Sequence, residues 1–508
     1  MQIISELQGK IPPMTELEQQ LLKRIAELEK QVTDKDSRIA YLEEQFKLAQ
    51  QKQFGKSTEG HPAQGDLFNE AEDIAELEVE AENETVTYTR KKAKRTALPA
   101  DLPREVIVHD IENKSCDCCG GEMHKMGEDK SEKLEFIPAQ IKVIEHVRPK
   151  YSCRACEQNE TQVQIKQAPM PASPIPKGIA TPSLLSQIIT SKYQYALPLY
   201  RQETMFKQHG IEISRQTMSD WIIKCASLFK PLYDKLHQIL LEQHVIQADE
   251  TTVNVVSDDK TKSYMWLYCT GTDTPVANNP FKNIVLYEYQ PGRSGCYPAN
   301  FLLNYTGYLQ VDGYQGYDQT KAKLAGCWAH ARRKFDEAEK AQPKGKTGKA
   351  NWALNHIQKL YRIETRIKDK TALEKQAIRK KESEPLLNQY KAWLEKSLLN
   401  TLPKSKLGEA LNYSLNQWDK LVQYVEDGHL SIDNNRAERA IKPFVIGRKN
   451  WLFSQTANGA NASAMLYSIV ETAKANGLIP YDYISYYLTQ ICKPGCQIDD
   501  LLPWNIKS

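Results

Sequence analysis

The stretch Val245-Ile-Gln-Ala-Asp-Glu-Thr-Thr-Val253 opens the part of this sequence in which short strands replace helices. Its β-branched and apolar residues predict a strand over Val245–Val256, with a carboxylate, Asp249, inside it. Further strands are expected at Ser263–Thr270, Asn283–Gln290, Gly307–Asp312 and Leu324–Trp328, and a helix near Ala299–Tyr305. Strands come first here and helices are interleaved later, so this region predicts a mixed α and β domain.

Three carboxylates stand where a polar side chain is unexpected. Asp249 lies inside the first strand, Asp312 ends a later strand, and Glu438 lies in Asp433-Asn-Asn-Arg-Ala-Glu-Arg439. If the two strands are neighbours and Glu438 projects from a helix across their ends, the three side chains can hold two Mg2+ ions roughly 4 Å apart. Such a pair activates water or a 3′-hydroxyl beside a phosphorus atom. Taken singly, each carboxylate is more often an edge, turn or surface-pair residue.

Length and composition exclude several classes of protein. A chain of 508 residues is long enough for about three domains. No apolar run approaches the roughly 18 residues that span a bilayer, which argues against a membrane protein. The amino end lacks the basic start and apolar core of a signal peptide, so a cytoplasmic location is expected. Eleven cysteines, unevenly spread, favour reduced thiols with a local metal site over a disulfide framework.

The amino-terminal segment has the spacing of a coiled coil. Its seam alternates steps of four and three, with one charged interruption, along Leu21, Ile25, Leu28, Val32, Lys35, Ile39, Leu42, Phe46 and Ala49. This heptad pattern predicts a coiled coil over residues 1–52 that joins copies of the chain, although a single amphipathic helix has the same spacing. Residues 53–99 contain an acidic stretch followed by a basic one and are expected to form a linker.

Two Cys-x-x-Cys pairs mark the next segment, residues 100–165. Four thiolates on two tight turns can close a tetrahedral shell around one structural Zn2+ ion. These thiolates belong to Cys116, Cys119, Cys153 and Cys156. The gap between the pairs is long, and the alternative ligands are Cys118, His124 and His146. A strand is expected between the pairs, within Pro138–Val147.

Residues 175–235 are expected to be helical and to resemble a helix-turn-helix. Helices are expected at Leu199–Gln208 and Arg215–Phe229, and Ser214 is a natural N-cap for the second. In a DNA-reading helix-turn-helix the start of the second helix faces the groove. The residues at that position are Arg215, Gln216, Thr217 and Ser219. A plain helical hairpin fits the same pattern equally well.

The carboxyl-terminal half is mostly helical. Between Ala329 and Asp433 the sequence is strongly helical and charged, which predicts an inserted or appended helical layer, at about residues 336–430, rather than a linker. From Ala457 onward the pattern is again helical, with a break at Gly477 and Pro480, and residues 476–508 are expected to form a C-terminal element.

Several motifs follow one another in the order of a known family. They are Ala248-Asp-Glu-Thr-Thr252, Gly307-Tyr-Leu-Gln-Val-Asp-Gly-Tyr314, Cys327-Trp-Ala-His-Ala-Arg-Arg-Lys-Phe335, Asp433-Asn-Asn-Arg-Ala-Glu-Arg439 and Gly447-Arg-Lys-Asn450. Together they resemble the insertion-sequence transposases of the IS-sixty-six family. The likeness extends to the zipper-like helix, the cysteine pairs and the C-terminal element, so it covers nearly the whole chain.

The resemblance implies a multidomain α+β protein whose catalytic domain, residues 240–475, has an RNase H-like fold interrupted by the helical insertion. It assigns the binding of catalytic Mg2+ or Mn2+ to Asp249, Asp312 and Glu438. Glu250 and Asp433 are neighbouring carboxylates that the sequence does not separate from these ligands. The coiled coil, a zinc-binding domain and a helical DNA-binding region precede the catalytic domain in this scheme.

Residues around the two later motifs are candidates for DNA contact. Similar Cys-x-x-His pairs occur near the active sites of other RNase H-like transposases, which implies a phosphate contact for His330, although a packing role is an equal alternative. Basic side chains beside these motifs suit binding to the phosphate backbone. They are Arg332, Arg333, Arg439, Lys442, Arg448 and Lys449. Trp451 is either a platform for an unpaired base or a core residue.

The resemblance implies a DNA transposase that binds the ends of its element and catalyses Mg2+-dependent strand cleavage and strand transfer. Its expected partners are double-stranded DNA at the terminal inverted repeats and the target, further copies of itself, and small accessory proteins. Two other functions share some of these modules. A non-catalytic zinc-dependent DNA-binding regulator would lack the chemistry, and a structure-selective nuclease would need neither a pairing helix nor an end sequence.

Overall fold

The computed structural model describes residues 141–151, 165–258, 262–277, 279–342 and 348–506, together with Val106 and scattered residues between Gln20 and Leu42. The chain divides into two compact units, with residues 83–171 in the smaller one. The described residues between Gln20 and Leu42 are helical. Their apolar seam residues Ile25, Leu28, Val32, Ile39 and Leu42 are about half exposed.

The smaller unit contains one short antiparallel pair among its described residues. Strand β1 (Lys150–Tyr151) pairs with β2 (Lys166–Gln167), and Arg148 donates a hydrogen bond to the carbonyl oxygen of Ala168. The strand expected within Pro138–Val147 is wrong for residues 141–147, which form no strand. Their apolar side chains are exposed, because none of the described segments pairs with them. The four cysteines of the expected zinc site lie outside the described residues.

A five-stranded mixed sheet forms the centre of the larger unit. Its strands are β3 (Val245–Val253), β4 (Ser263–Thr270), β5 (Ile284–Gln290), β6 (Tyr308–Gln310) and β7 (Lys323–Ala325). The spatial order is β5-β4-β3-β6-β7, with the first three strands antiparallel and β6 and β7 parallel to β3. All five expected strands are confirmed, with ends trimmed by a few residues where pairing stops. The expected helix near Ala299–Tyr305 is α9 (Cys296–Phe301), which begins earlier.

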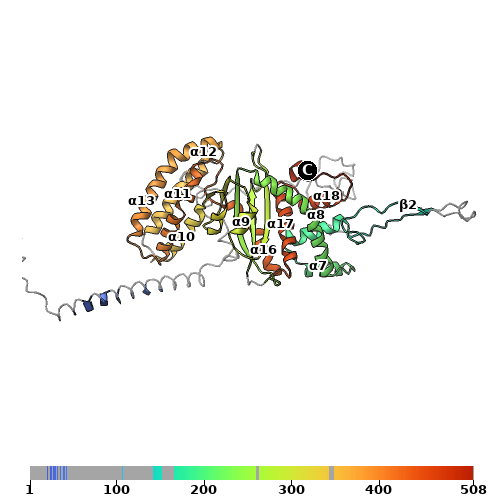
Figure 1. Ribbon diagram of the computed structural model, residues 1–508, viewed down its shortest axis with the longest axis horizontal. Coiled ribbons are helices and arrows are strands. Elements are labelled where there is room, and N and C mark those ends of the chain that lie inside the picture. The colour runs from blue at the N-terminus through green and yellow to red at the C-terminus, as the bar shows by residue number, and fades with distance from the viewer. Residues whose placement is uncertain are drawn as a thin grey trace, which may run out of the picture. The chain divides into compact units, whose positions relative to one another are not determined.

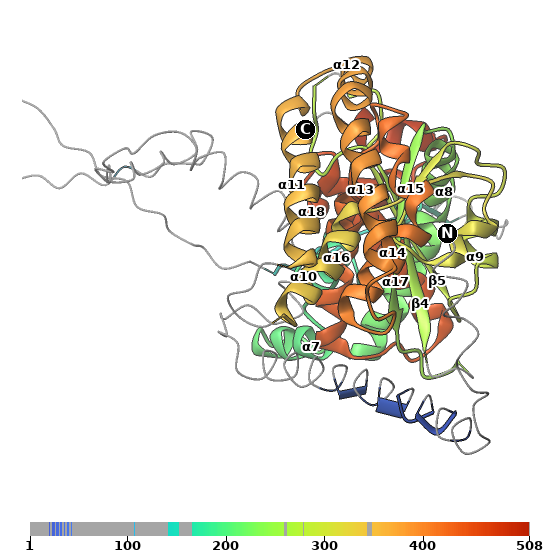
Figure 2. The ribbon, with the colours of Figure 1, turned by 90° about the vertical axis from the view of Figure 1, so that its left-hand side faces the viewer.

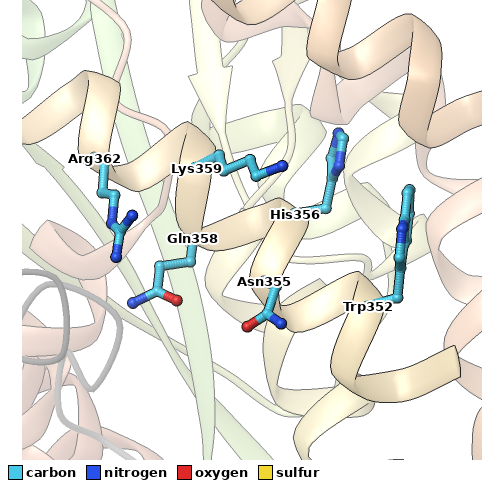
Figure 3. Close-up of a pocket in the computed structure, with 6 residues that line it drawn as sticks. All are labelled: Trp352, Asn355, His356, Gln358, Lys359 and Arg362. Carbon is cyan, nitrogen blue, oxygen red and sulfur yellow. The ribbon is translucent and has the colours of Figure 1, made fainter. Parts of the chain in front are cut away.

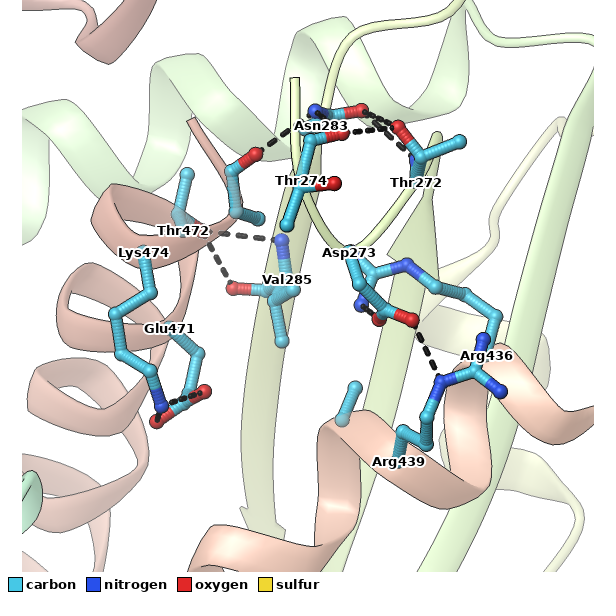
Figure 4. A network of polar contacts seen from close by, with 12 residues as sticks. Thr272, Asp273, Thr274, Asn283, Val285, Arg436, Arg439, Glu471, Thr472 and Lys474 are labelled. Atoms are coloured by element: carbon cyan, nitrogen blue, oxygen red, sulfur yellow. Dashed lines mark hydrogen bonds and ion pairs between the residues drawn. The ribbon is translucent and has the colours of Figure 1, made fainter. Parts of the chain in front are cut away.

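Helices from distant parts of the chain cover this sheet. Helix α17 (Ala457–Ala475) packs against β5, and α8 (Arg215–Leu241) packs against both α17 and β5. The edge strand β5 finds partners on α17. Its backbone N–H at Val285 donates to the Thr472 hydroxyl (Figure 4), and its N–H at Tyr287 donates to the Ser468 hydroxyl. A helix therefore occupies an edge that would otherwise offer unpaired strand groups. Helix α16 (Asn435–Trp451) packs against β3 and β4.

Of the helices that precede the sheet in sequence, one is longer than expected. The bounds of α7 (Leu199–Gln208) agree with the prediction, and the Ser214 hydroxyl caps α8 by accepting the Thr217 N–H at 3.1 Å. Helix α8 does not end near Phe229 but continues through Pro231 to Leu241. Three leucines beyond Pro231 are fully buried, and this burial offsets the backbone hydrogen bond that a proline removes. Helix α6 (Pro182–Tyr193) precedes them.

The helical insertion has its own hydrophobic core. Its helices are α10 (Trp328–Lys340), α11 (Lys349–Ile367), α12 (Ala372–Ile378), α13 (Glu384–Leu398), α14 (Lys406–Asn416) and α15 (Trp418–Leu421). Trp328, Phe335, Tyr390 and Trp418 belong to this second core, which is separate from the core around the sheet. Figure 1 shows α10–α13 to one side of the sheet and α17 to the other, and Figure 2 shows α11, α13 and α14 as one layer. The helices between Trp328 and Leu421 agree with the helical pattern expected for this part of the sequence.

The end of the chain returns to the sheet domain. Helix α18 (Pro480–Gln490) follows the break at Gly477 and Pro480, as expected, and packs against α6. None of the helices in the described part of the chain is both long and apolar enough to cross a membrane.

Candidate active site

Asp249 lies in the middle of β3, and Asp312 follows the end of the neighbouring parallel strand β6. The register of β3 and β6 pairs Gln247 with Gln310, and each aspartate follows two residues after its glutamine. Side chains two residues apart along a strand point to the same face, so both carboxylates face the same side of the sheet. Both side chains are half-buried. The structure thus brings together two residues that are 63 positions apart in sequence.

The backbone and the insertion hold the loop after β6 in place. The backbone N–H of Tyr314 donates to Asp312 Oδ1 at 2.8 Å, and the N–H of Glu250 donates to Asp249 Oδ1 at 2.7 Å. Gly313 lies so close to α14 that a Cβ atom there would meet the Tyr413 ring at 2.8 Å. A larger residue beside Asp312 would force the Tyr413 ring to shift, because α14 packs against this loop.

The carboxylates form one cluster of like charge. Burial raises the pKa of Asp249 well above its usual range, and the nearby charges of Glu250, Asp312 and Glu438 raise it further. Carboxylates that repel one another favour a bound proton or a cation between them. This cluster is the kind of site at which perturbed pKa values mark function.

Glu438 joins this cluster from the first turn of α16. Its side chain is 7% exposed, its Oε1 atom lies 3.5 Å from His330 Nδ1, and its Oε2 atom lies 3.7 Å from Arg333 Nη2. Burial is the main cause that lowers the pKa of His330, so its imidazole is mostly neutral at pH 7. Within the described part of the chain, neither Glu438 Oε1 nor His330 Nδ1 has a hydrogen-bond partner. Glu438 Oε1 is therefore a buried acceptor with capacity left for a further donor or a cation.

Cys327 completes a group that sequence reasoning did not assemble. One ligand atom each of Cys327, His330 and Glu438 lies within 4.8 Å of the others. Burial raises the pKa of the Cys327 thiol well above its usual range, and its sulfur accepts the Asn434 N–H at 3.2 Å. A protonated thiol is a poor metal ligand, whereas carboxylate oxygens are the ligands that Mg2+ prefers. The donor set of Asp249, Asp312 and Glu438 therefore fits Mg2+ or Mn2+.

The two carboxylates that the sequence left as alternatives have other partners. The buried side chain of Glu250 accepts from Arg293 Nε at 2.9 Å and from the Tyr317 hydroxyl at 2.6 Å. Asp433 accepts from the Tyr361 hydroxyl and from the Asn435 N–H, each at 3.2 Å. Both are tied to protein groups, which favours Asp249 and Glu438 as the residues that face a ligand.

Arg293 is a cation at this site that the sequence did not reveal. Its guanidinium lies over the Tyr314 ring at 4.0 Å while it pairs with Glu250. Tyr314 also donates its backbone N–H to Asp312, so contacts link Arg293 both to Glu250 of β3 and to the loop after β6. Arg293 follows Gln290-Pro-Gly in a loop that has no periodic pattern, and no sequence signal distinguished it.

The basic residues expected to bind DNA have different surroundings. Arg439 Nε pairs with Asp273 Oδ2 at 2.6 Å, beside the buried Arg436 that pairs with the same carboxylate (Figure 4). Arg448 donates to the Thr251 hydroxyl at 2.8 Å, which ties α16 to β3. Lys449 is exposed. Only Lys449 of these three therefore presents its charge without a protein partner among the described residues.

The remaining candidates lie on three helices. Arg332 and Arg333 are half-buried on α10, and Lys442 is half-buried on α16, where burial lowers the pKa of its ammonium group. At the start of α8, Arg215 and Gln216 are exposed and Thr217 is half-buried.

Trp451 packs at the edge of the hydrophobic core around the sheet. Its ring lies 6.1 Å from that of Tyr467 and 6.4 Å from that of Phe444. Lys192 Nζ lies over the same ring at 5.3 Å. These contacts favour the packing role over a platform for an unpaired base.

A family model described as "Transposase IS66 family" matches residues 177–462, more than half of the chain. The chain belongs to the IS66 transposase family. Further models match a zinc-finger binding domain of transposase IS66 over residues 113–157, Transposase C of IS166 homeodomain over residues 41–107, and the IS66 C-terminal element over residues 468–504. The resemblance drawn from the motifs is thereby confirmed, and the family indicates a transposase with structural zinc and DNA as its partner.

Curated relatives of this IS66-family chain carry no assigned activity. The "Uncharacterized protein y4jD" of Sinorhizobium fredii is 33% identical over 427 residues, which cover 81% of this chain and 82% of that protein. The "Uncharacterized protein y4qI" of the same organism is 34% identical over 432 residues, which cover 81% of this chain and 77% of that protein. No solved structure matches the chain closely enough to count as similar.

Proposed function

We propose that this chain is a DNA transposase that binds the ends of its element and catalyses Mg2+-dependent strand cleavage and strand transfer. The observation that carries the proposal is the register of β3 and β6, which sets Asp249 in the middle of β3 beside Asp312, just past the end of the parallel strand β6. The strand order, with three antiparallel strands followed by two parallel ones, supports an RNase H-like fold for the catalytic domain.

Asp249, Asp312 and Glu438 are the proposed metal ligands. When bound, Mg2+ supplies a Lewis acid that activates the attacking oxygen and stabilises the leaving oxygen of a phosphodiester. The protein contributes fixed positions, because each carboxylate comes from a different packed element. His330 and Arg333 flank Glu438 and orient its carboxylate. The half-buried Arg333 guanidinium and the His330 ring are the proposed contacts to the scissile phosphate.

DNA binding is assigned to two surfaces. The exposed start of α8, with Arg215, Gln216 and Thr217, is the proposed reader of the element end. The basic residues of α10 and α16 are the proposed contacts to phosphates near the carboxylates.

The proposal is tested by cleavage of a labelled duplex that carries the element's own end, with Mg2+ present. Asp249→Asn, Asp312→Asn and Glu438→Gln should bind the duplex and fail to cut it. Asp318→Asn is the matched control, because Asp318 is an exposed aspartate soon after β6 that pairs with Lys420 outside the cluster. Binding without cutting by the wild type, even with accessory proteins, would favour the regulator. Cutting that ignores the end sequence would favour the nuclease.

The zinc and oligomer proposals have separate tests. Cys116, Cys119, Cys153 and Cys156 are the proposed zinc ligands, and metal analysis of the purified chain should find one zinc per chain that Cys153→Ser removes. The exposed apolar seam of the amino-terminal helix supports pairing of chains through a coiled coil. Removal of residues 1–50 should lower the oligomeric state in light scattering.

A further inference from the structure

The two ends of the helical insertion are tied together beside the carboxylate cluster. The backbone N–H of Trp328, at the start of α10, donates to the carbonyl oxygen of Ile432 at 3.1 Å. Two residues later, the Asn434 N–H donates to the Cys327 sulfur at 3.2 Å. These bonds fix the point at which the chain leaves the insertion and enters α16, the helix that carries Glu438.

The Asn434 side chain extends from this point to β3. Its Nδ2 atom donates to the carbonyl oxygen of Ala248 at 2.8 Å. Ala248 immediately precedes Asp249 in the strand, and Asn434 is only 1% exposed. A buried hydrogen bond therefore joins the segment before α16 to the strand that carries Asp249.

The Ala248 carbonyl lies just beyond the end of its strand pairing. The carbonyl of His244 accepts the Tyr308 N–H of β6 at 3.0 Å, and alternate carbonyls of a strand point to the same side. The Ala248 carbonyl therefore faces the β6 side as well, one residue after Gln247, where the pairing of β3 with β6 ends. A buried carbonyl needs a donor, and Asn434 supplies it from 186 positions away in sequence.

Asn434 is also the N-cap of α16, yet its side chain does not cap the helix. Its carbonyl oxygen accepts the Glu438 N–H at 3.2 Å, whereas its Oδ1 atom has no partner among the described residues. Its backbone angles, φ −99° and ψ 25°, differ from the extended conformation in which an asparagine side chain usually caps. A buried acceptor without a donor is unfavourable, so the bond to β3, rather than capping, accounts for this amide.

We propose that Asn434 is a positioning residue that fixes Asp249 relative to Glu438 and so preorganises the carboxylate cluster for a divalent cation. Its side chain holds β3 one residue before Asp249, and its carbonyl holds the first turn of α16 at Glu438. Like charges drive these carboxylates apart until a cation binds, and the bonds of one residue to both elements oppose that separation. The inference rests on the proposed function, because it takes the cluster to be the metal site.

The test measures Mn2+ binding to the full chain without DNA, by electron paramagnetic resonance, and the Mg2+ dependence of single-turnover cleavage. The variant is Asn434→Ser, because serine starts a helix as well as asparagine does, but its hydroxyl is one bond nearer the backbone and does not reach the Ala248 carbonyl. Asn476→Ser is the matched control. Asn476 follows α17, and its Nδ2 atom likewise donates to a carbonyl oxygen, that of Asn283 before β5, at 2.7 Å. Glu438→Gln identifies the Mn2+ that is bound at the cluster.

Asn434→Ser should raise the dissociation constant of Mn2+ at the cluster, and the Mg2+ concentration for half-maximal cleavage, about 10–100-fold. Saturating Mg2+ should restore most of the cleavage rate, because the bound cation then draws the carboxylates together. A purely structural defect would lower the rate at every Mg2+ concentration. Asn476→Ser should change neither quantity, and the melting temperatures of the two variants should fall by similar amounts, since each loses one side-chain hydrogen bond.

An unchanged Mn2+ affinity in Asn434→Ser overturns the inference, even where cleavage by the wild type supports the transposase proposal. A melting temperature of Asn434→Ser far below that of Asn476→Ser also overturns it, because Asn434 would then serve stability rather than position. A wild-type chain that binds Mn2+ through Glu438, with an affinity that Asn434→Ser lowers, but never cuts DNA would overturn the transposase proposal and leave this inference standing.

Discussion

The carboxylate cluster around Asp249 and the exposed face of α11 that carries Lys359 and Arg362 (Figure 3) are opposites in charge and in burial. The first gathers Asp249, Glu250 and Glu438 in a largely buried space, where their charges interact strongly. The second leaves Lys359 and Arg362 exposed, where water screens them. Buried like charges are costly and therefore require a small cation or a proton, whereas exposed like charges cost little and attract a large polyanion.

The largest expected effect separates two buried glutamates of the cluster. Glu438→Gln should lower the cleavage rate more than about a hundredfold, because it removes a proposed metal ligand. Glu250→Gln should lower it no more than about tenfold, because Glu250 already pairs with Arg293 and a glutamine still accepts from Tyr317. Single-turnover cleavage with Mg2+ measures both. Equal losses in cleavage rate would mean that Glu250 also serves as a ligand and that the proposed difference between the two glutamates is wrong.

The second prediction concerns the contact between the insertion and the cluster. Gly313→Ala should lower cleavage about tenfold and stability by about 1–3 kcal/mol, because the new methyl group meets the Tyr413 ring and displaces Asp312. Gly459→Ala is the control, since its nearest neighbour is the Thr456 hydroxyl at 3.5 Å. Cleavage assays and thermal melts measure the two effects. Tyr413→Ala combined with Gly313→Ala should restore cleavage, and a failure to do so would contradict the steric explanation.

The third prediction uses the pH dependence of the buried charge. The raised pKa of Asp249 means that its protonated form stabilises the fold. Without divalent cation, that contribution is complete below the unfolded pKa of about 4 and is lost as pH rises through the folded pKa. Asp249→Asn lacks this loss, so it should exceed the wild type in stability by about 1 kcal/mol or more at pH 7, and by less at pH 4. Denaturant unfolding at the two pH values checks this, and added Mg2+ should shrink the difference. A stability difference between Asp249→Asn and the wild type that stays the same at both pH values would argue against a raised pKa of Asp249 in this cluster.

The smallest effect distinguishes basic residues with and without a protein partner. Lys449→Ala should weaken binding to duplex DNA two- to fivefold at 0.15 M salt and lower the salt slope by about 0.9. Arg439→Ala should change both less, because Asp273 already neutralises Arg439. Filter binding over a salt series measures the slopes. A larger effect for Arg439 would show that DNA displaces it from Asp273.

Local patterns predicted the elements of this fold well. The strands from Val245 to Ala325 and the helix Leu199–Gln208 follow their periodicity closely, because alternation and heptad-like spacing report which face is buried. Two expectations were wrong for the same reason. The strand within Pro138–Val147 has no described partner, and α8 continues past Phe229 because leucines beyond Pro231 are buried by α17 and the sheet. In both cases the outcome depends on whether a segment from elsewhere in the chain packs against the element, which a local pattern does not report.

The sequence by itself determined the family, the order of the modules and the three carboxylates worth testing, because motifs in order are independent of how they pack. Only the tertiary structure decided which charges meet. The pairing of β3 with β6 brought Asp312 beside Asp249, and contacts between α10 and α16 placed Cys327 and His330 near Glu438. Ion pairs joined Glu250 to Arg293 and Arg439 to Asp273. Those contacts join positions far apart in sequence, and a local pattern carries information only about neighbours along the chain.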